Sequence, residues 1–184
     1  MNFVAEAAIP YLASPATTSD VTELVRLMEE FHAESGYVLD RQWAGRSFVT
    51  LLRDQSLGKV WLVRCGELVV GHVVLTVRFS MEYGGTDAFI DDLFVRPEHR
   101  RRGAASAALS AVLAECRERK VLALHVEVGQ DNVAANALYT RFGLLLGSDR
   151  RQTRTIDFGG QEPFFREQSG GRSQQAPGKA MDKR

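Results

Sequence analysis

The sequence predicts an α/β fold of the α+β kind, built on a mixed, mostly antiparallel sheet of six to seven strands with helices on both faces. Three observations support this fold class. The chain has 184 residues, a length typical of one domain, and 45% of them are apolar. Strand-like runs alternate with helical patterns along the chain. The first half supplies hairpins and the second half supplies strand–helix–strand crossovers, which together predict a mixed sheet.

The N-terminal part is expected to form one short strand and two helices. The apolar residues 9–13 predict the strand. Asp20, with Glu23 three residues later in a capping-box-like arrangement, begins a helix that Gly36 ends. A weaker helical pattern covers residues 41–54. The apolar face of the first helix consists of Val21, Leu24, Val25, Met28 and Phe31.

The middle of the chain predicts a hairpin, because β-branched and aromatic residues fill 60–65 and 68–79 on either side of a turn at Gly66 and Glu67. Gly143 follows the last expected helix in a position suited to a left-handed residue. The elements expected after the hairpin are a strand at 89–95, a helix at 102–119, a strand at 121–128, a helix at 132–142 and two last strands at 144–146 and 153–158.

These elements make up one expected domain at residues 1–158. Residues 159–184 are rich in Gly, Ser and Gln and contain few large apolar residues. Such a segment buries too little apolar surface to offset the entropy lost on ordering. We therefore expect most of it to be a disordered tail.

Composition and charge exclude several functional classes. Lys and Arg total 23, and Asp and Glu also total 23, so the balance gives no case for a general nucleic-acid or membrane-surface binder. Cys65 and Cys116 are too few for a disulfide framework, and the four scattered histidines predict no metal site. No apolar run is long enough to span a membrane, and the first ten residues do not resemble a secretory signal. We expect a cytoplasmic protein.

The most informative stretch is residues 95–106, which join a strand to a helix. The first backbone N–H groups of a helix have no intrahelical partners and carry the positive end of its dipole, so this turn is suited to an anion. Residues 103–105 are Gly-Ala-Ala and leave room for it, while residues 100–102 are three arginines. A diphosphate fits this turn. The alternative is an ordinary solvated helix start, and neither the Rossmann pattern nor a P-loop is present.

Two motifs, in order and at the usual separation, resemble those of the GNAT superfamily of acyl-CoA-dependent N-acyltransferases. Residues 90–105 are similar to its first motif, a strand followed by Gln/Arg-x-x-Gly-x-Gly/Ala, whose positions Arg100, Gly103 and Ala105 fill. Residues 132–143 resemble its second motif, Asn-x-x-Ala-x-x-Leu-Tyr-x-x-x-Gly. The resemblance covers about residues 8–158. It implies a V-shaped splay between the fourth and fifth strands.

The resemblance implies acetyl-CoA as co-substrate and no metal. The N–H groups of residues 101–106 would hold the diphosphate, and the strand before them would pair with the pantetheine arm. A backbone N–H near Phe94 would stabilise the oxyanion. Asn132 occupies a family position that contacts the arm or orders the splay. The residues implied in cofactor binding are Leu93, Phe94, Val95, Arg100, Arg101, Arg102, Gly103, Ala104, Ala105, Ser106 and Asn132.

Three residues are implied in the chemistry. Tyr139 falls where many members place the acid that protonates the leaving thiolate, although its spacing from Ala135 and Phe142 fits a core position equally well. Asp91 and Asp92 lie beside the expected thioester, and strand alternation predicts that only one faces the acceptor amine. Related small-amine enzymes favour the first acid as base, here Asp91, whereas other branches use the second. Either role requires a raised pKa or a water relay. Alternatively, one Asp binds the substrate cation and the other is structural.

The stretch 79–92 looks most like the branch that acts on polyamines and thialysine-type amines. Residues 82–92 contain Glu82, Asp87, Asp91 and Asp92 and no Lys or Arg. Such carboxylates could attract a cationic amine, although surface carboxylates are also common. Further candidates for the acceptor wall are Glu29, Glu30, Glu34, Tyr37 and Trp43, of which the two aromatic residues fit a core position equally well.

We therefore expect an enzyme that transfers an acetyl group from acetyl-CoA to a primary amine of a small cationic molecule. Alternatives are an acetyltransferase of a protein amine or an aminoglycoside, and a non-catalytic acyl-CoA-binding regulatory domain. A nucleic-acid-binding module is disfavoured, because no aromatic residues are interleaved with the arginines at 100–102. No membrane partner is expected, and many relatives are dimers, which suggests a homodimer by analogy alone.

Overall fold

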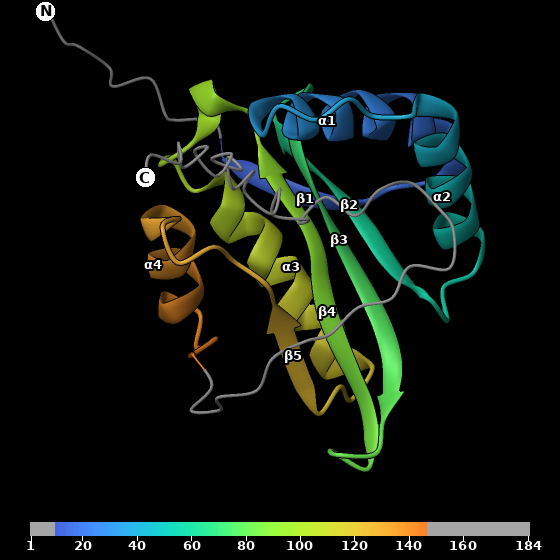
Figure 1. The fold of residues 1–184 in the computed structure, drawn as a ribbon, viewed down its shortest axis with the longest axis vertical. Helices are drawn as coiled ribbons and strands as arrows, with labels where there is room; N and C mark the ends of the chain where they lie inside the picture. Colours follow the sequence, from blue (N-terminus) through green and yellow to red (C-terminus); the bar gives the residue numbers. More distant parts are fainter. Residues whose placement is uncertain (1–9, 147–184) are drawn as a thin grey trace, which may run out of the picture. The chain divides into compact units, whose positions relative to one another are not determined.

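A five-stranded sheet forms the centre of the fold (Figure 1). The computed structural model describes residues 10–146, all of which belong to one unit. The strands lie in the sheet in chain order, the first four pair antiparallel, and the last pair is parallel. The strands are β1 (Tyr11–Pro15), β2 (Gly58–Cys65), β3 (Leu68–Ser80), β4 (Gly85–Val95) and β5 (Ala123–Val126).

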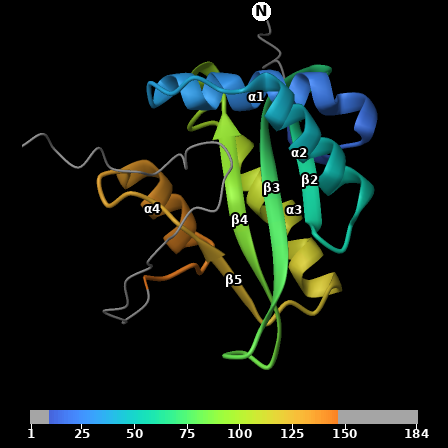
Figure 2. The ribbon, with the colours of Figure 1, turned by 45° about the vertical axis from the view of Figure 1, so that its right-hand side comes forward.

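Helices cover both faces of this sheet, as the sequence predicts (Figures 1 and 2). On one face, α3 and Tyr139 of α4 pack against a core that includes Val73 and Leu75 of β3. On the other face, α1 and α2 pack against Val74 of the same strand. The helices are α1 (Val21–Glu34), α2 (Arg41–Arg53), α3 (Ala104–Glu118) and α4 (Val133–Arg141), with short 3₁₀ turns η1 (Thr18–Asp20) and η2 (Pro97–His99).

The prediction of six to seven strands is wrong, since the described residues form five. Residues 144–146 follow α4 without joining a strand, because no ladder partner lies beside them among residues 10–146. The strand expected at 153–158 and the tail expected at 159–184 lie outside the described residues.

Two other local expectations are corrected. β4 starts at Gly85, four residues earlier than the apolar run suggests, because β3 pairs with it down to the hairpin turn. Glu23 is not part of a capping box: Asp20 accepts the hydrogen bond of the Thr17 backbone N–H at 2.8 Å, whereas Glu23 pairs with Arg26.

Within the described part of the chain, no strand pairs with the outer side of the end of β4. β5 pairs with β4 only over residues 87–90, while β4 continues for five more residues along β3. The two strands then diverge, and Figure 2 shows the resulting V between them. This is the splay that the sequence resemblance implies.

Candidate functional site

The open outer edge of β4 presents backbone groups that no strand uses. The Arg96 backbone N–H donates to Val70 on β3, and the Phe94 carbonyl also points toward β3. Because peptide groups alternate in direction along a strand, those of Leu93 and Val95 point to the open edge. The ring of Phe94 is buried in the core on the face of the sheet that α1 and α2 cover. Of the three predicted residues, Leu93 and Val95 are therefore better placed to pair with an extended ligand, Val95 through its N–H group, because its carbonyl accepts a hydrogen bond from Arg100.

The turn after β4 contains a group of backbone N–H donors that no residue among 10–146 satisfies. Pro97 begins η2, Arg101 and Gly103 have positive φ values of 60° and 102°, and α3 starts at Ala104. No described residue accepts a hydrogen bond from the backbone N–H groups of residues 101–106. Helix starts with free N–H groups attract anions. The predicted anion site at 101–106 thus has its donors available.

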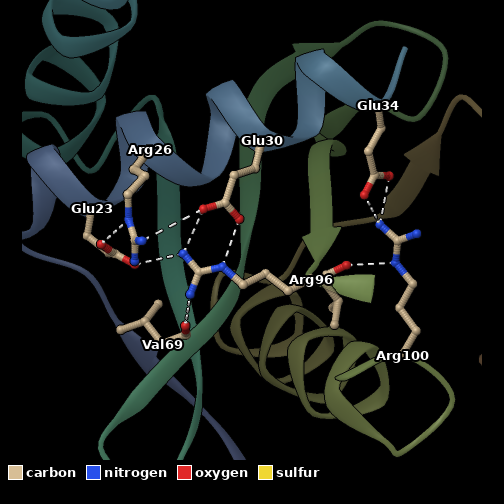
Figure 3. Close-up of polar contacts among 8 residues, drawn as sticks. Glu23, Arg26, Glu30, Glu34, Val69, Arg96 and Arg100 are labelled. Carbon is tan, nitrogen blue, oxygen red and sulfur yellow. Dashed lines mark hydrogen bonds and ion pairs between the residues drawn. The ribbon is translucent and has the colours of Figure 1, made fainter. Parts of the chain in front are cut away.

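The three predicted arginines of this turn have different surroundings. Arg100 donates its Nε–H to the Val95 carbonyl at 2.7 Å and its Nη2 to Glu34 at 2.6 Å (Figure 3). It therefore ties α1 to the turn. Arg101 and Arg102 are exposed and contact no acid among residues 10–146, so their charge is available to an anion.

A fourth arginine, which the sequence analysis missed, lies at the same turn. Arg141 on α4 donates to the Ser106 hydroxyl at 2.6 Å. It brings a positive charge to the start of α3 from 35 residues away. No local pattern marks it, because its contact depends on how α4 packs.

A β-bulge changes the arrangement of the two predicted aspartates. Asp92 pairs with Val74 and Ile90 pairs with Leu75, so Asp91 is an extra residue between them. The Asp91 carboxylate bonds to Thr76, which lies on the same face of β3 as Val74. The prediction that Asp91 and Asp92 point to opposite faces is therefore wrong, because the bulge interrupts the alternation. Both carboxyl groups reach the face opposite α3.

Both carboxyl groups hold their protons more tightly than ordinary aspartates. Burial raises the pKa of Asp92 to about 6, and the negative charge of Asp91 adds to this shift. Burial also raises the pKa of Asp91, and Glu127 contributes, although the hydrogen bond from Thr76 acts in the opposite direction. The raised pKa values that the sequence analysis requires of a carboxylate base are present here.

Asn132 and Tyr139 both have structural roles. The Asn132 side chain accepts the Ala135 backbone N–H at 3.1 Å and so caps α4. Tyr139 is 8% exposed within the core beside α3, and burial raises the pKa of its phenol to about 12. Tyr139 also lines a hollow of about 790 Å³ between β5, α3 and α4. Tyr139 is therefore part of the core and also lines a cavity.

The acids on α1 are already paired with arginines. Glu29 accepts a hydrogen bond from Arg41. Glu30 accepts two hydrogen bonds from Arg96, and Glu34 accepts from Arg100 (Figure 3). Their charges are largely neutralised, which weakens the expectation that they attract an amine. Of the two aromatic candidates, Trp43 packs with the core under α1 and α2, and Tyr37 is exposed.

Three residues that the sequence analysis did not connect, Asp87, Arg78 and His125, meet on the face of β4 and β5 opposite α3. Asp87 is fully buried and accepts two hydrogen bonds from Arg78, both at 2.9 Å. This pairing holds the pKa of Asp87 below its usual value. His125 on β5 lies against Asp87, with its Nε2 3.4 Å from an Asp87 oxygen. Glu127 follows the end of β5, and its charge acts on Asp91.

The described part of the chain offers neither a metal-ion cluster nor a membrane-spanning helix. Residues 10–146 contain no group of three or more His, Cys, Asp or Glu side chains placed to hold a metal ion. None of the helices between these limits is long and apolar enough to cross a membrane.

Comparison with known proteins supplies a family and a set of similar structures. The sequence profile of the acetyltransferase (GNAT) family matches residues 19–144. An integron cassette protein from the mobile metagenome of Cole Harbour Salt Marsh is 38% identical, with a TM-score of 0.73, over 86% of this chain and 97% of that one. No curated protein matches this chain.

Two more distant structures share the fold. The ribosomal-protein-alanine N-acetyltransferase of Brucella melitensis biovar Abortus is 19% identical, with a TM-score of 0.63, over 82% of this chain and all of that one. A predicted acetyltransferase from Clostridium acetobutylicum, whose structure was determined with acetyl-CoA, is 14% identical, with a TM-score of 0.65, over 79% of this chain and 96% of that one.

Proposed function

Because the chain belongs to the GNAT family of acetyltransferases, we propose that it transfers an acetyl group from acetyl-CoA to the primary amine of a small cationic molecule. The observation that carries this proposal is the turn at 101–106, where backbone N–H groups that bond to no described residue lie next to the outer edge of β4. These features fit the diphosphate and the extended arm of one ligand.

Each part of the site then has a role. The N–H groups of residues 101–106, with Arg101, Arg102 and Arg141, hold the diphosphate. Leu93 and Val95 align the arm along β4, and the free N–H groups at this edge stabilise negative charge on the thioester oxygen. Acetyl-CoA supplies the acyl group to be transferred.

The acceptor side of the site is acidic. Asp91 and Asp92 reach one face, where the charge of Glu127, just after β5, also acts on Asp91, and together they suit a single ammonium group. The carboxylates hold the ammonium and take its proton, a role that their raised pKa values support. Tyr139 stays protonated at neutral pH, because its pKa is about 12, and protonates the leaving thiolate.

The first experiment separates the possible activities. Calorimetry with acetyl-CoA should show binding, and a thiol-release assay should show turnover with amines from a panel of polyamines, amino acids, aminoglycosides and peptides. Absence of binding at millimolar acetyl-CoA would reject the assignment. Binding without turnover on any amine would favour a regulatory acyl-CoA-binding domain.

A matched pair of variants tests the location of the diphosphate. Gly103→Glu and Gly103→Gln both place a side chain at a residue with φ of 102°, where there is open space, so the two share the same backbone strain. They differ by one negative charge. We expect Gly103→Glu to bind acetyl-CoA at least about tenfold more weakly than Gly103→Gln, since its carboxylate faces the diphosphate. Equal affinities would place the diphosphate elsewhere.

A further inference from the structure

The extra residue of β4, Asp91, is held by a side chain of the neighbouring strand. The residues on either side of Asp91 pair with consecutive residues of β3, so Asp91 itself has no cross-strand partner. Its carboxylate instead accepts a hydrogen bond from the hydroxyl of Thr76 on β3. Bulges next to active sites re-aim a side chain in this way. The direction of the Asp91 carboxylate therefore depends on Thr76 as well as on its own backbone.

The two acids differ in their access to solvent. Asp91 is exposed, whereas Asp92 is half-buried and pairs with Val74, whose side chain belongs to the core under α1 and α2. Burial raises the pKa of Asp92 to about 6, while the hydrogen bond from Thr76 lowers the pKa of Asp91 against the effect of its own burial. Such a bond favours the ionised form of a carboxyl group. Asp91 is therefore the better place for a negative charge, and Asp92 is the better place for a proton.

The groups around the two acids leave Thr76 as the main support for a charge on Asp91. The charged and titratable groups that share this face of the sheet, or follow β5, are His72, Arg78, Asp87, His125 and Glu127. Burial lowers the pKa of His72 to about 4, so this ring is neutral near pH 7. Arg78 and Asp87 neutralise each other through two hydrogen bonds. The charge of Glu127 disfavours a charge on Asp91.

We infer that Thr76 gives the two acids different tasks: its hydroxyl holds Asp91 as the carboxylate that binds the ammonium group of the acceptor, and Asp92 is the base. This inference rests on the proposed function. Thr76 is a positioning residue, since it acts through Asp91. The sequence resemblance favours the first acid as base, whereas the bulge, the bond from Thr76 and the partial burial of Asp92 favour the second.

The protons balance under this assignment. Asp92 takes one proton from the ammonium group, and the neutral amine forms its N–C bond with the acetyl carbon as the C–S bond of the thioester breaks. Tyr139 gives its proton to the leaving thiolate. The nitrogen then loses a second proton to water, and water returns one to the phenolate of Tyr139. Asp92 releases its proton to water, so one proton leaves per turnover while Asp91 stays ionised.

Kinetics of the full chain separate binding from proton transfer. Asp92→Asn should lower kcat about a hundredfold or more, with the KM for the amine changed less than about threefold, because a general base is lost. Asp91→Asn should raise that KM about tenfold or more and lower kcat less than Asp92→Asn does, because a charge-assisted hydrogen bond to the ammonium group is lost. The reverse division, with kcat lost in Asp91→Asn and kept in Asp92→Asn, would overturn the assignment.

Matched variants test the part of Thr76. Thr76→Val keeps the β-branched shape without the hydroxyl, and Thr76→Ser keeps the hydroxyl. Thr76→Val should raise the KM for the amine about threefold or more and leave kcat within about twofold, because the carboxylate of Asp91 loses its anchor. Thr76→Ser should restore the wild-type KM. Equal losses in both variants would mean that Thr76 acts only through packing, which would overturn its role.

Carboxyl-carbon NMR follows both acids in the free protein without any substrate. Asp91 should ionise at lower pH than Asp92 in the wild type. In Thr76→Val the titration of Asp91 should move to higher pH by at least about 0.5, because its ionised form loses a hydrogen bond, and in Thr76→Ser it should not move. Ionisation of Asp92 before Asp91, or an unchanged titration in Thr76→Val, would overturn the inference.

The outcomes separate this inference from the proposed function. Wild-type protein that acetylates no amine would reject the proposed function and the assignment of Asp91 and Asp92 with it. An active wild type would uphold the proposed function. If Thr76→Val then keeps the wild-type KM, or the two Asn variants show the reverse division, the inference alone is rejected.

Discussion

His72 on β3 is fully buried, and neither of its ring nitrogens has a hydrogen-bond partner among residues 10–146. It lies between the rings of Phe48 and Phe94, with centroids 6.3 and 6.2 Å away. Burial lowers the pKa of His72 from 6.5 to about 4. The folded state therefore keeps this ring neutral at pH values where the unfolded chain binds a proton.

This difference predicts a loss of stability in acid. Below the unfolded pKa of 6.5 the unfolded state takes up a proton that the folded state does not, so the free energy of unfolding falls as pH drops toward 4. Between pH 7 and 5 the contribution lost is about 2 kcal/mol. His72→Leu should remove that part of the pH dependence in denaturant unfolding. Parallel pH profiles for variant and wild type would contradict this reading.

Asp91 and Asp92 show how far residue-level prediction extends. The motif identifies both acids as candidates for the chemistry. Strand alternation assigns them opposite faces, and this assignment fails because β4 holds one residue more than β3 at this point. A bulge is a property of two paired strands, so the sequence of β4 alone does not indicate it.

At the scale of elements, α1 is joined to the end of β4 by buried and half-buried ion pairs (Figure 3). Arg96 donates to Glu30 at 2.7 and 2.9 Å and to Glu23 at 3.3 Å. It also donates to the Val69 carbonyl, and its side chain is only 10% exposed. The same helix holds Arg100 beside the proposed diphosphate turn. The position of α1 and that of the turn are therefore linked.

Arg96→Met should destabilise the fold far more than Arg26→Met. The first change removes a side chain that is only 10% exposed and leaves Glu30, which is 35% exposed, with its longer 3.9 Å contact to Arg26. We expect a loss of about 1–3 kcal/mol in the free energy of unfolding. Arg26 pairs with Glu23 on the same helix, but its side chain is 53% exposed, so its loss should stay below about 1 kcal/mol. Denaturant unfolding of both variants measures the difference. Similar losses of stability in the two variants would mean that the ion pairs of Arg96 with Glu23 and Glu30 do not join α1 to the sheet.

The expected elements match the observed ones best where a local signal ends them. Asp40 caps α2 through the Gln42 and Trp43 N–H groups, and the hairpin turn at Gly66 and Glu67 lies where the sequence predicts it. β5 is shorter than its apolar run, because β4 offers it only four ladder partners before the splay. The length of β5 therefore depends on its neighbour in the sheet.

For the whole molecule, acetyl-CoA binding should raise thermal stability. The turn, the edge of β4 and α4 meet only in the folded state, so a ligand that contacts all three binds the folded state alone. At 100 times its Kd it should add about 2.7 kcal/mol. For a domain of this size, the expected rise in Tm is about 5–10 °C. Scanning calorimetry with and without acetyl-CoA measures it, and Gly103→Glu should show no rise at the same concentration. An equal rise in that variant would contradict binding at the turn.

The sequence by itself determined the family and the order of the described elements, and it singled out the turn proposed for the diphosphate and the candidate residues Asp91, Asp92 and Tyr139. Each of these depends on a pattern within about a dozen residues, where backbone rules and motif spacing act locally. Only the tertiary structure decided that Asp91 and Asp92 share a face, that Arg100 is held by Glu34 from 66 residues away, and that Asp87 lies behind His125. These contacts depend on strand register and helix packing, which arise from interactions between distant segments.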